Sequence, residues 1–301
     1  MCNQRCLFCS NPENERTLSL GDAHEQLKKL KKAGYFGVIL TGGEPTLHPE
    51  LERIVRMSRD EGLHVRMITN GQCTAEEGVL EELIRAGLQH VHLSVHSARP
   101  EVQSYLTSNP DSWANLYKTF KLVEKLNITC DVNTVICAQN ADHLDQTVQT
   151  IIERFDFVRH FVWNNIDPKM NRVAENPQTV AKLADFELAL FRAVKILESS
   201  SRTYRIERLP LCYMAEFAQA STETRKIVKE EERTVHFLDE KGEIRQTDFM
   251  HDKAEVCSFC KFDSICAGLY DLDGAYSSDE LYAVFLDPQV IIDRIIKKDA
   301  K

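Results

Sequence analysis

Three cysteines lie within the first nine residues, at Cys2, Cys6 and Cys9, in the spacing C-x3-C-x2-C. Thiolates are the soft ligands that iron–sulfur chemistry uses, and a short loop brings three of them to one face. Such a triad can hold three corners of a cubane [4Fe–4S] cluster and leave the fourth iron open to a small molecule, as a catalytic zinc keeps one position free. Taken alone, the spacing also fits three ligands of a zinc site or a chance cluster.

A second motif, Thr41-Gly42-Gly43-Glu44-Pro45, ends an apolar run about 35 residues later. Glycines let the backbone approach a ligand closely, and a glutamate carboxylate accepts hydrogen bonds from an ammonium group. By itself the motif also suits an ordinary connection from a strand to a helix, with Glu44 as the cap of a helix near Pro49. The two motifs in this order are far more specific than either one.

Together the motifs resemble the radical S-adenosylmethionine (radical SAM) superfamily, whose signature is this cysteine triad with an aromatic residue, here Phe8, before the last ligand. The resemblance covers roughly residues 1 to 165 with ordered motifs, and the rest more loosely. It implies that S-adenosylmethionine chelates the open iron. One electron, from a donor such as flavodoxin or ferredoxin, then cleaves the sulfonium and releases a 5′-deoxyadenosyl radical. This radical would abstract hydrogen from a peptide or small-metabolite substrate.

The resemblance also implies which residues contact the cofactor. The Gly42–Pro45 segment matches the family motif that binds the methionine amino group. Polar residues at the ends of later strands match positions near the ribose and the methionine carboxylate, or on the cofactor side of a strand: Thr69, Asn70, Ser94, His96 and Asn133. Two alternatives stay open, because His96 also suits an ordinary polar strand end and Asn133 a hydrogen-bonded core amide.

A second cysteine group, Cys257, Cys260 and Cys266, has the spacing C-x2-C-x5-C, and Cys212 lies about 45 residues upstream. Four ligands from two segments can close a metal site completely. The group resembles the SPASM or twitch extension of radical SAM proteins, a C-terminal subdomain with auxiliary iron–sulfur clusters. A full SPASM pattern holds two clusters and more cysteines, so four cysteines predict one [4Fe–4S] cluster. Structural zinc is the alternative.

Three further cysteines remain. Cys130 and Cys137 stand in apolar surroundings, and we expect both to be buried small apolar residues. Cys73 is left without a predicted role.

Apolar runs of strand length alternate with amphipathic helical segments, the pattern of a parallel β/α sheet. We expect strands near residues 35–41, 63–69, 89–95, 128–136, 157–163 and 203–207. We expect helices near residues 20–33, 49–61, 75–86, 112–126, 141–154 and 178–198. Several of these helices end at a glycine that suits a left-handed C-terminal cap: Gly34, Gly62 and Gly87.

Such units close into a full or partial barrel with its chemistry at the carboxyl ends of the strands. The predicted fold is therefore α/β, a partial (β/α)6 TIM-like barrel over residues 1–207 with a small C-terminal twitch-like iron–sulfur subdomain over residues 208–301. Within the latter, Val235–Asp239 and Lys241-Gly242 read as a short hairpin. The Trp163–Asp167 segment is a candidate for lining the substrate side of the barrel mouth.

The sequence departs from the family at its start. Radical SAM barrels normally begin with a strand that leads into the cysteine loop, and only Met1 precedes Cys2. We expect either a truncated start or a barrel without its first strand, which leaves the edge of the next strand unpaired. This departure is the support for an alternative function, a non-catalytic iron–sulfur or zinc protein that keeps the fold.

Composition limits the class of protein. The chain has 301 residues, of which 43% are apolar, enough for one α/β barrel or two modest domains. The net charge is −9 and no basic cluster contains interleaved aromatic residues, so nucleic acid is a poor substrate. No secretory segment and no run of about 20 apolar residues is found. We therefore expect a cytoplasmic protein whose cysteines bind metal rather than form disulfides.

Overall fold

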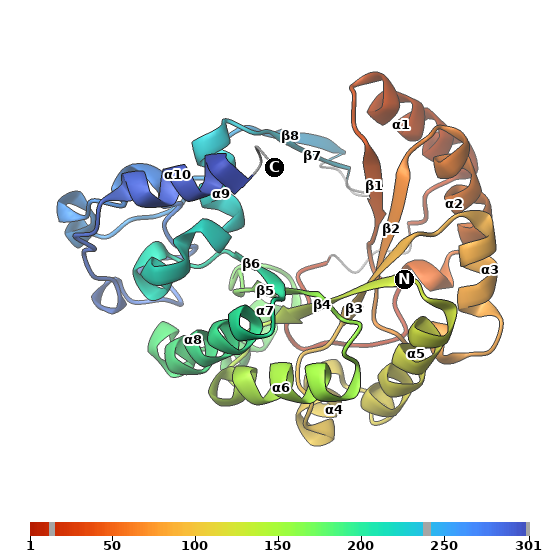
Figure 1. Ribbon diagram of the computed structural model, residues 1–301, viewed down its shortest axis with the longest axis horizontal. Coiled ribbons are helices and arrows are strands. Elements are labelled where there is room, and N and C mark those ends of the chain that lie inside the picture. The colour runs from red at the N-terminus through yellow and green to blue at the C-terminus, as the bar shows by residue number, and fades with distance from the viewer. Residues whose placement is uncertain (12–15, 237–241, 299–301) are drawn as a thin grey trace. The chain divides into compact units, whose positions relative to one another are not determined.

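Parallel strands that alternate with helices build most of the chain (Figure 1). The computed structural model describes residues 1–11, 16–236 and 242–298. Six strands form one sheet in the order of the sequence: β1 (Gly37–Leu40), β2 (His64–Thr69), β3 (His90–Ser94), β4 (Thr129–Val135), β5 (His160–Asn164) and β6 (Thr203–Glu207). Every strand overlaps its predicted range, and the predicted partial (β/α)6 barrel is confirmed.

Helices connect these strands and follow them. The longer ones are α1 (Leu20–Lys32), α2 (Leu51–Asp60), α3 (Val79–Ala86), α4 (Pro100–Thr107), α5 (Ser112–Leu126), α6 (Leu144–Arg154), α8 (Leu183–Ser199), α9 (Thr222–Lys229) and α10 (Pro288–Lys298), and α7 (Arg172–Glu175) is a single turn. The sequence pattern did not predict α4, α7, α9 or α10. Gly34, Gly62 and Gly87 have positive φ angles at the ends of α1, α2 and α3, so the predicted glycine caps are confirmed.

The chain divides into two compact units, and the first contains Met1–Leu7, Asn11–Thr134 and Gln149–Phe161. Strands β1 to β4 are parallel neighbours there, and helices α1, α2, α3 and α5 lie along one side of them (Figure 1). Alternate strand residues such as Val65, Met67, Val91 and Leu93 are buried in the core. Since side chains alternate along a strand, the residues between them face the opposite side of the sheet.

Strand β1 has β2 as its neighbour and stands at the end of the strand order in the described part of the chain. Its Ile39 is 40% exposed, and Phe36 just before it is 72% exposed. The expectation of an unpaired edge at the first strand after the cysteine loop is therefore confirmed for the described residues.

The second unit contains Phe8–Ser10, Val135–Val148 and Val162–Lys301. Its core includes the fully buried side chains of Trp163, Phe186 and Tyr276. Strands β7 (Arg233–His236) and β8 (Glu243–Gln246) form an antiparallel pair, so the predicted hairpin is confirmed at both sides of residues 237–241, which lie outside the described residues. None of the described helices has both the length and the apolar composition that crossing a bilayer requires.

Candidate functional site

The N-terminal cysteine loop is fixed to helix ends of the first unit. The backbone N–H of Leu7 donates to the carbonyl of Leu106 at 2.9 Å, in the last turn of α4. Gln4, only 6% exposed, donates from Nε2 to Ser112 Oγ, at the start of α5, over 3.1 Å. These buried contacts give the loop one conformation, because a buried polar group without its partner is costly. The unpredicted helix α4 is thus part of what positions the cysteines.

Of the cysteines in this loop, Cys2 is exposed, and Cys6 and Cys9 are half-buried. Asn70 Nδ2 lies 3.8 Å from Cys2 Sγ as a donor, and the Cys6 thiol donates to Gln4 Oε1 at the same separation. Cys9 belongs to the Phe8–Ser10 segment of the second unit. Amide donors to sulfur are one means by which proteins tune iron–sulfur clusters, so Asn70 suits a place beside a cluster ligand.

The Gly-Gly-Glu-Pro segment lies against the start of the cysteine loop. The backbone N–H of Glu44 donates to the carbonyl of Met1 at 3.0 Å. A Cβ atom on Gly43 would lie 1.9 Å from the Met1 carbonyl oxygen and 3.4 Å from Cys2 Cβ. Gly42 has a φ angle of +141°, which favours glycine. The structure thus brings the two sequence motifs together, and this close approach explains why position 43 requires glycine.

The Glu44 carboxylate, with 4% of the residue exposed, connects the ends of β1 and β2. Its Oε1 accepts hydrogen bonds from Thr46 N at 3.1 Å, Thr46 Oγ1 at 2.6 Å and Thr69 Oγ1 at 2.7 Å. Its Oε2 accepts from Asn70 N at 2.8 Å. Burial raises the pKa of Glu44, and the hydrogen bonds from Asn70, Thr46 and Thr69 oppose that rise. Oε2 keeps capacity for a second donor, such as an ammonium group.

Glu44 caps a helix, but not the one near Pro49 that the capping alternative proposed. Glu44 caps the 3-10 helix η1 (Pro45–Leu47) through its bond to Thr46 N, whereas α2 begins at Leu51 after Glu50. Pro45 is the first residue of η1 and is buried. Capping and ligand binding are compatible here because they use different carboxylate oxygens.

Asn70 joins the end of β2 to the cysteine loop. Its Nδ2 donates to Asn3 Oδ1 at 2.7 Å, and its Oδ1 accepts from Gln72 N at 3.1 Å. Asn3 also donates to Cys73 Sγ at 3.4 Å. Sequence reasoning missed Asn3 and Gln72, since the only signal for Asn3 is its place between two predicted ligands. Thr69 is 1% exposed, and its hydroxyl also accepts from Gly71 N.

The strand-end residues of β3 and β4 differ in exposure. Ser94 and Asn133 are register partners on neighbouring strands, and both are half-buried. His96 is 4% exposed, and burial lowers its pKa to about 3. Its imidazole is therefore neutral at pH 7, which suits hydrogen bonding rather than proton transfer.

Two residues of the Trp163–Asp167 segment do not line an open mouth, and that part of the prediction is wrong. Trp163 is 2% and Asn165 1% exposed. The Asn165 amide is used within the second unit, where Oδ1 accepts from Tyr276 Oη at 3.1 Å and Nδ2 donates to the Arg208 carbonyl at 3.2 Å. Buried amides need such partners, and a strand-end position alone did not distinguish this role from a ligand-binding one.

The second cysteine group lies wholly within the second unit, on short 3-10 helices and at their ends. Cys212 is in η5 (Leu211–Ala220) and Cys257 in η6 (Glu255–Phe259), while Cys260 and Cys266 follow η6 and η7 (Asp263–Ile265). All four are half-buried free thiols. By contrast, Cys130 and Cys137 are buried as predicted.

Backbone N–H groups surround the sulfur atoms of this group. Leu211 N and Gly268 N each lie 3.4 Å from Cys266 Sγ, and Val284 N lies 3.2 Å from Cys260 Sγ. Gly268 has a φ angle of +87°, and a Cβ there would lie 2.4 Å from the Asp252 carbonyl oxygen. Such amide donors stabilise thiolates at metal centres.

The thiols of this group influence one another electrostatically. Burial raises the pKa of Cys212 to about 12, and the nearby sulfur atoms of Cys266 and Cys257 add to the increase. Burial also raises the pKa of Cys266, which the backbone donors and Lys253 oppose. Buried thiols of this kind are protonated at neutral pH, and a bound metal cation would replace their protons.

Among the described cysteines, no three sulfur atoms lie within 4.8 Å of one another. Tetrahedral zinc, with Zn–S bonds of about 2.3 Å, holds its sulfur ligands about 3.8 Å apart. A four-iron cluster binds each cysteine through a different iron, so its ligands stand farther apart.

The Radical SAM superfamily model matches residues 1–151, half of the chain. A partial β/α barrel with a cysteine loop against a Gly-Gly-Glu-Pro turn is the arrangement that the sequence resemblance implied. The chain belongs to the Radical SAM superfamily.

Two curated relatives illustrate the range of similar proteins. The GTP 3′,8-cyclase of Aquifex aeolicus is 34% identical over 144 residues, 45% of this chain and 44% of that protein. The PqqA peptide cyclase of Methylobacterium nodulans is 33% identical over 156 residues, 50% of this chain and 41% of that protein. The chain thus spans less than half the length of either relative.

Solved structures share the fold over more of the chain. SuiB of Streptococcus suis bound to S-adenosylmethionine aligns with a TM-score of 0.66 and 16% identity, over 94% of this chain and 74% of that one. The structure of anSMEcpe with bound AdoMet and the Kp18Cys peptide aligns with a TM-score of 0.63 and 14% identity, over 100% of this chain and 96% of that one. At these identities the likeness concerns the fold.

Proposed function

We propose that this chain is a radical SAM enzyme, which cleaves S-adenosylmethionine reductively and uses the 5′-deoxyadenosyl radical to abstract hydrogen from its substrate. The observation that carries the proposal is the contact between the two motifs, in which Gly43 has no room for a side chain beside Met1 and Cys2. Cys2 and the Glu44 carboxylate therefore lie at one edge of the sheet, which supports a cluster ligand and a partner for the methionine ammonium at that edge.

Each residue of this edge has a proposed task. Cys2, Cys6 and Cys9 would hold a [4Fe–4S] cluster, which supplies the chelating iron and one electron when bound. Glu44 would accept a hydrogen bond from the methionine ammonium at Oε2. Because Glu44 is buried, little water competes for that contact, so a charge-assisted bond there is strong. Asn70 would hold Cys2 in orientation through its amide.

The other predicted cofactor contacts are weaker candidates for direct binding. Ser94 and Asn133 are half-buried register partners that can offer a hydroxyl and an amide to the ribose or the carboxylate. Thr69 and His96 are buried, and we propose that they position the strand ends rather than touch the ligand.

We propose the substrate class as a peptide or a small metabolite. The names of two similar proteins, the PqqA peptide cyclase and anSMEcpe with its bound Kp18Cys peptide, support a peptide. The name of the GTP 3′,8-cyclase supports a small molecule. A low-potential donor such as flavodoxin or ferredoxin would deliver the electron, and cysteines that bind clusters would suit a reducing cytoplasm.

We propose further that residues 1–207 form the barrel domain and residues 208–301 a twitch-like subdomain with one auxiliary [4Fe–4S] cluster. The ligands would be Cys212, Cys257, Cys260 and Cys266. The backbone amides that donate to Cys260 and Cys266 support metal-bound thiolates there, and we propose iron–sulfur rather than zinc because of the family. This cluster would bind substrate or accept an electron.

Anaerobic reconstitution with iron and sulfide tests the proposal. We expect about eight irons per chain, and 5′-deoxyadenosine after addition of dithionite and S-adenosylmethionine. A non-catalytic protein that keeps the fold would bind iron or zinc and yield no 5′-deoxyadenosine. If the reconstituted protein binds no iron, the proposal is wrong.

A further inference from the structure

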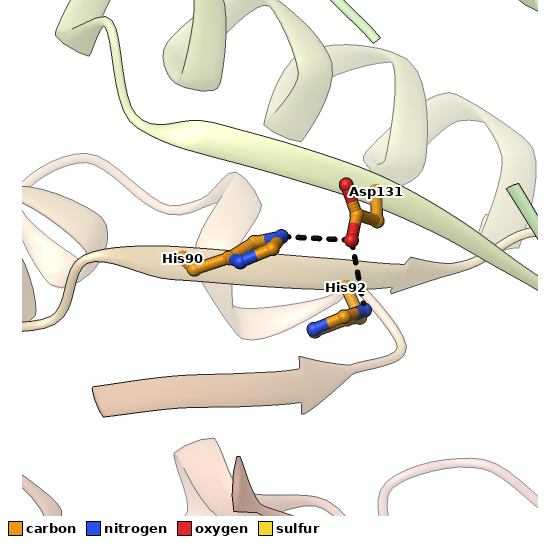
Figure 2. A group of neighbouring side chains, drawn as sticks. All are labelled: His90, His92 and Asp131. Carbon is orange, nitrogen blue, oxygen red and sulfur yellow. Dashed lines mark ion pairs between the residues drawn. The ribbon is translucent and has the colours of Figure 1, made fainter. Parts of the chain in front are cut away.

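A group of metal-ligand side chains lies on the first unit, apart from both cysteine groups. His90 and His92 extend from β3 and Asp131 from β4, and the three point toward one another (Figure 2). His92 and Asp131 are register partners, and His90 is two residues before His92 on the same face. That face is opposite to the one that carries the buried Val91, Leu93 and Val132.

The spacing of their ligand atoms is that of ligands around one ion. His90 Nε2 lies 2.9 Å and His92 Nδ1 3.5 Å from the same oxygen, Asp131 Oδ2. With metal–ligand bonds of about 2.1 Å, neighbouring ligands are about 3.0 Å apart in an octahedral site and about 3.4 Å apart in a tetrahedral one. The two imidazole rings are also nearly parallel, with centroids 4.4 Å apart.

Hydrogen bonding does not account for the group. The Nε2 atoms of His90 and His92 are both buried and have no hydrogen-bond partner. His90 Nε2 lies 2.9 Å from Asp131 Oδ2, within ion-pair range, yet it makes no hydrogen bond there. Leaving such a nitrogen unpaired costs free energy, and a cation between His90 Nε2 and the Asp131 carboxylate would satisfy these two groups. The side chain of Asp131 is 8% exposed, and a buried carboxylate also needs a cation or donors.

We propose that His90, His92 and Asp131 bind a divalent transition-metal ion such as Zn²⁺ or Fe²⁺. Two imidazoles and one carboxylate on a single face are a ligand set that such ions prefer, and three protein ligands leave at least one position for water or another ligand. Arg66, the register partner of His90 on β2, is a nearby positive charge that opposes a cation. An anionic ligand at the open position, such as hydroxide or a carboxylate, would offset that charge. The site is independent of the proposed function.

Zinc binding by the iron–sulfur-loaded protein tests the site, because the clusters then occupy the cysteine ligands. We expect one retained zinc per chain, with zinc K-edge absorption giving only nitrogen and oxygen neighbours at about 2.0–2.1 Å. No retained zinc, or retained zinc without nitrogen and oxygen neighbours at about 2.0–2.1 Å, would overturn the proposal. This measurement needs no variant and therefore does not depend on the folding of one.

Variants assign the ligands. His92→Gln and Asp131→Asn should each weaken zinc binding at least about tenfold, the loss that even second-shell changes cause. His64→Gln is the matched control, since His64 lies beside His90 with ring centroids 6.4 Å apart and is outside the ligand group. Unchanged zinc affinity in His92→Gln, or an equal loss in His64→Gln, would contradict the assignment.

Discussion

Replacing Glu44 with glutamine separates the structural role of this side chain from its proposed binding role. The new amide oxygen can take the place of Oε1, which accepts from Thr46 and Thr69. The amide NH2 then takes the place of Oε2 and faces Asn70 N, which now donates to that oxygen at 2.8 Å. Two donors would face each other at that point, and the negative charge is lost.

The two effects have separate magnitudes. One unsatisfied buried N–H lowers the free energy of unfolding by about 1–3 kcal/mol. Loss of a charge-assisted hydrogen bond to the ligand ammonium costs about 1.5–3 kcal/mol, which raises the Kd for S-adenosylmethionine about ten- to a hundredfold. The cysteines are unchanged, so the iron content should stay the same.

Equilibrium binding of S-adenosylmethionine to the anaerobically reconstituted protein measures this effect, with iron determined on the same samples. Glu50→Gln is the matched control, because Glu50 is a nearby glutamate with a 40% exposed side chain that pairs with Arg53 on the surface. That control should keep the wild-type Kd. If Glu44→Gln also keeps the wild-type Kd at full iron content, Glu44 only connects the strand ends, and its proposed contact with the ligand is wrong.

The remaining predictions concern the loop, the second cluster and pH. Gly43→Ala should lose the iron of the first cluster, because its Cβ would lie 1.9 Å from the Met1 carbonyl oxygen, whereas Gly21→Ala has its nearest neighbour at 3.8 Å and should keep the iron; equal iron in both variants would contradict the close approach. Changing Cys257 and Cys260 together to Ala should reduce iron from about eight to about four per chain and spare uncoupled cleavage of S-adenosylmethionine, and a wild type that already holds only about four irons per chain, by Mössbauer spectroscopy and iron analysis, would refute the auxiliary cluster. His96 has a folded pKa of about 3 against 6.5 for the ordinary group, so the unfolded chain binds a proton that the folded chain does not, and this contribution to the free energy of unfolding is lost as the pH falls below 6.5. Between pH 6.5 and 5.5 the free energy of unfolding should fall by about 1 kcal/mol more in the wild type than in His96→Asn. Denaturant unfolding at several pH values measures it, and an equal change with pH in the two proteins would exclude a buried neutral His96.

The strands of the barrel could be predicted because their buried faces are apolar and regular. In β2 and β3, the buried Val65, Met67, Val91 and Leu93 alternate with half-buried residues, most of them polar, and this period identifies a strand whatever its neighbours are. Helix α4 has only eight residues and begins at Pro100, so its period is short and its first residue looks like a loop. Yet its last turn holds the cysteine loop, which a sequence pattern does not reveal.

The cysteine ligands and the Gly-Gly-Glu-Pro turn could be predicted because their chemistry is written in residue type and spacing. The hydrogen bonds of Thr69 and Asn70 to Glu44 could not be predicted, because the pairing of β1 with β2 brings these residues together. The same is true of His90, His92 and Asp131. Their positions on alternate residues indicate a polar strand face, but the pairing of β3 with β4 brings Asp131 beside His92.

The most direct test of the central claim is 5′-deoxyadenosine formed per chain by the reconstituted protein with dithionite and S-adenosylmethionine. The wild type and Cys73→Ala should form it, because Cys73 is a half-buried thiol beside the loop that contacts Asn3 and is outside the proposed ligand set. Cys6→Ala should form none, because no other thiol is expected to replace a ligand of the first cluster. Equal 5′-deoxyadenosine from Cys6→Ala, or none from the wild type at full iron content, would contradict the account.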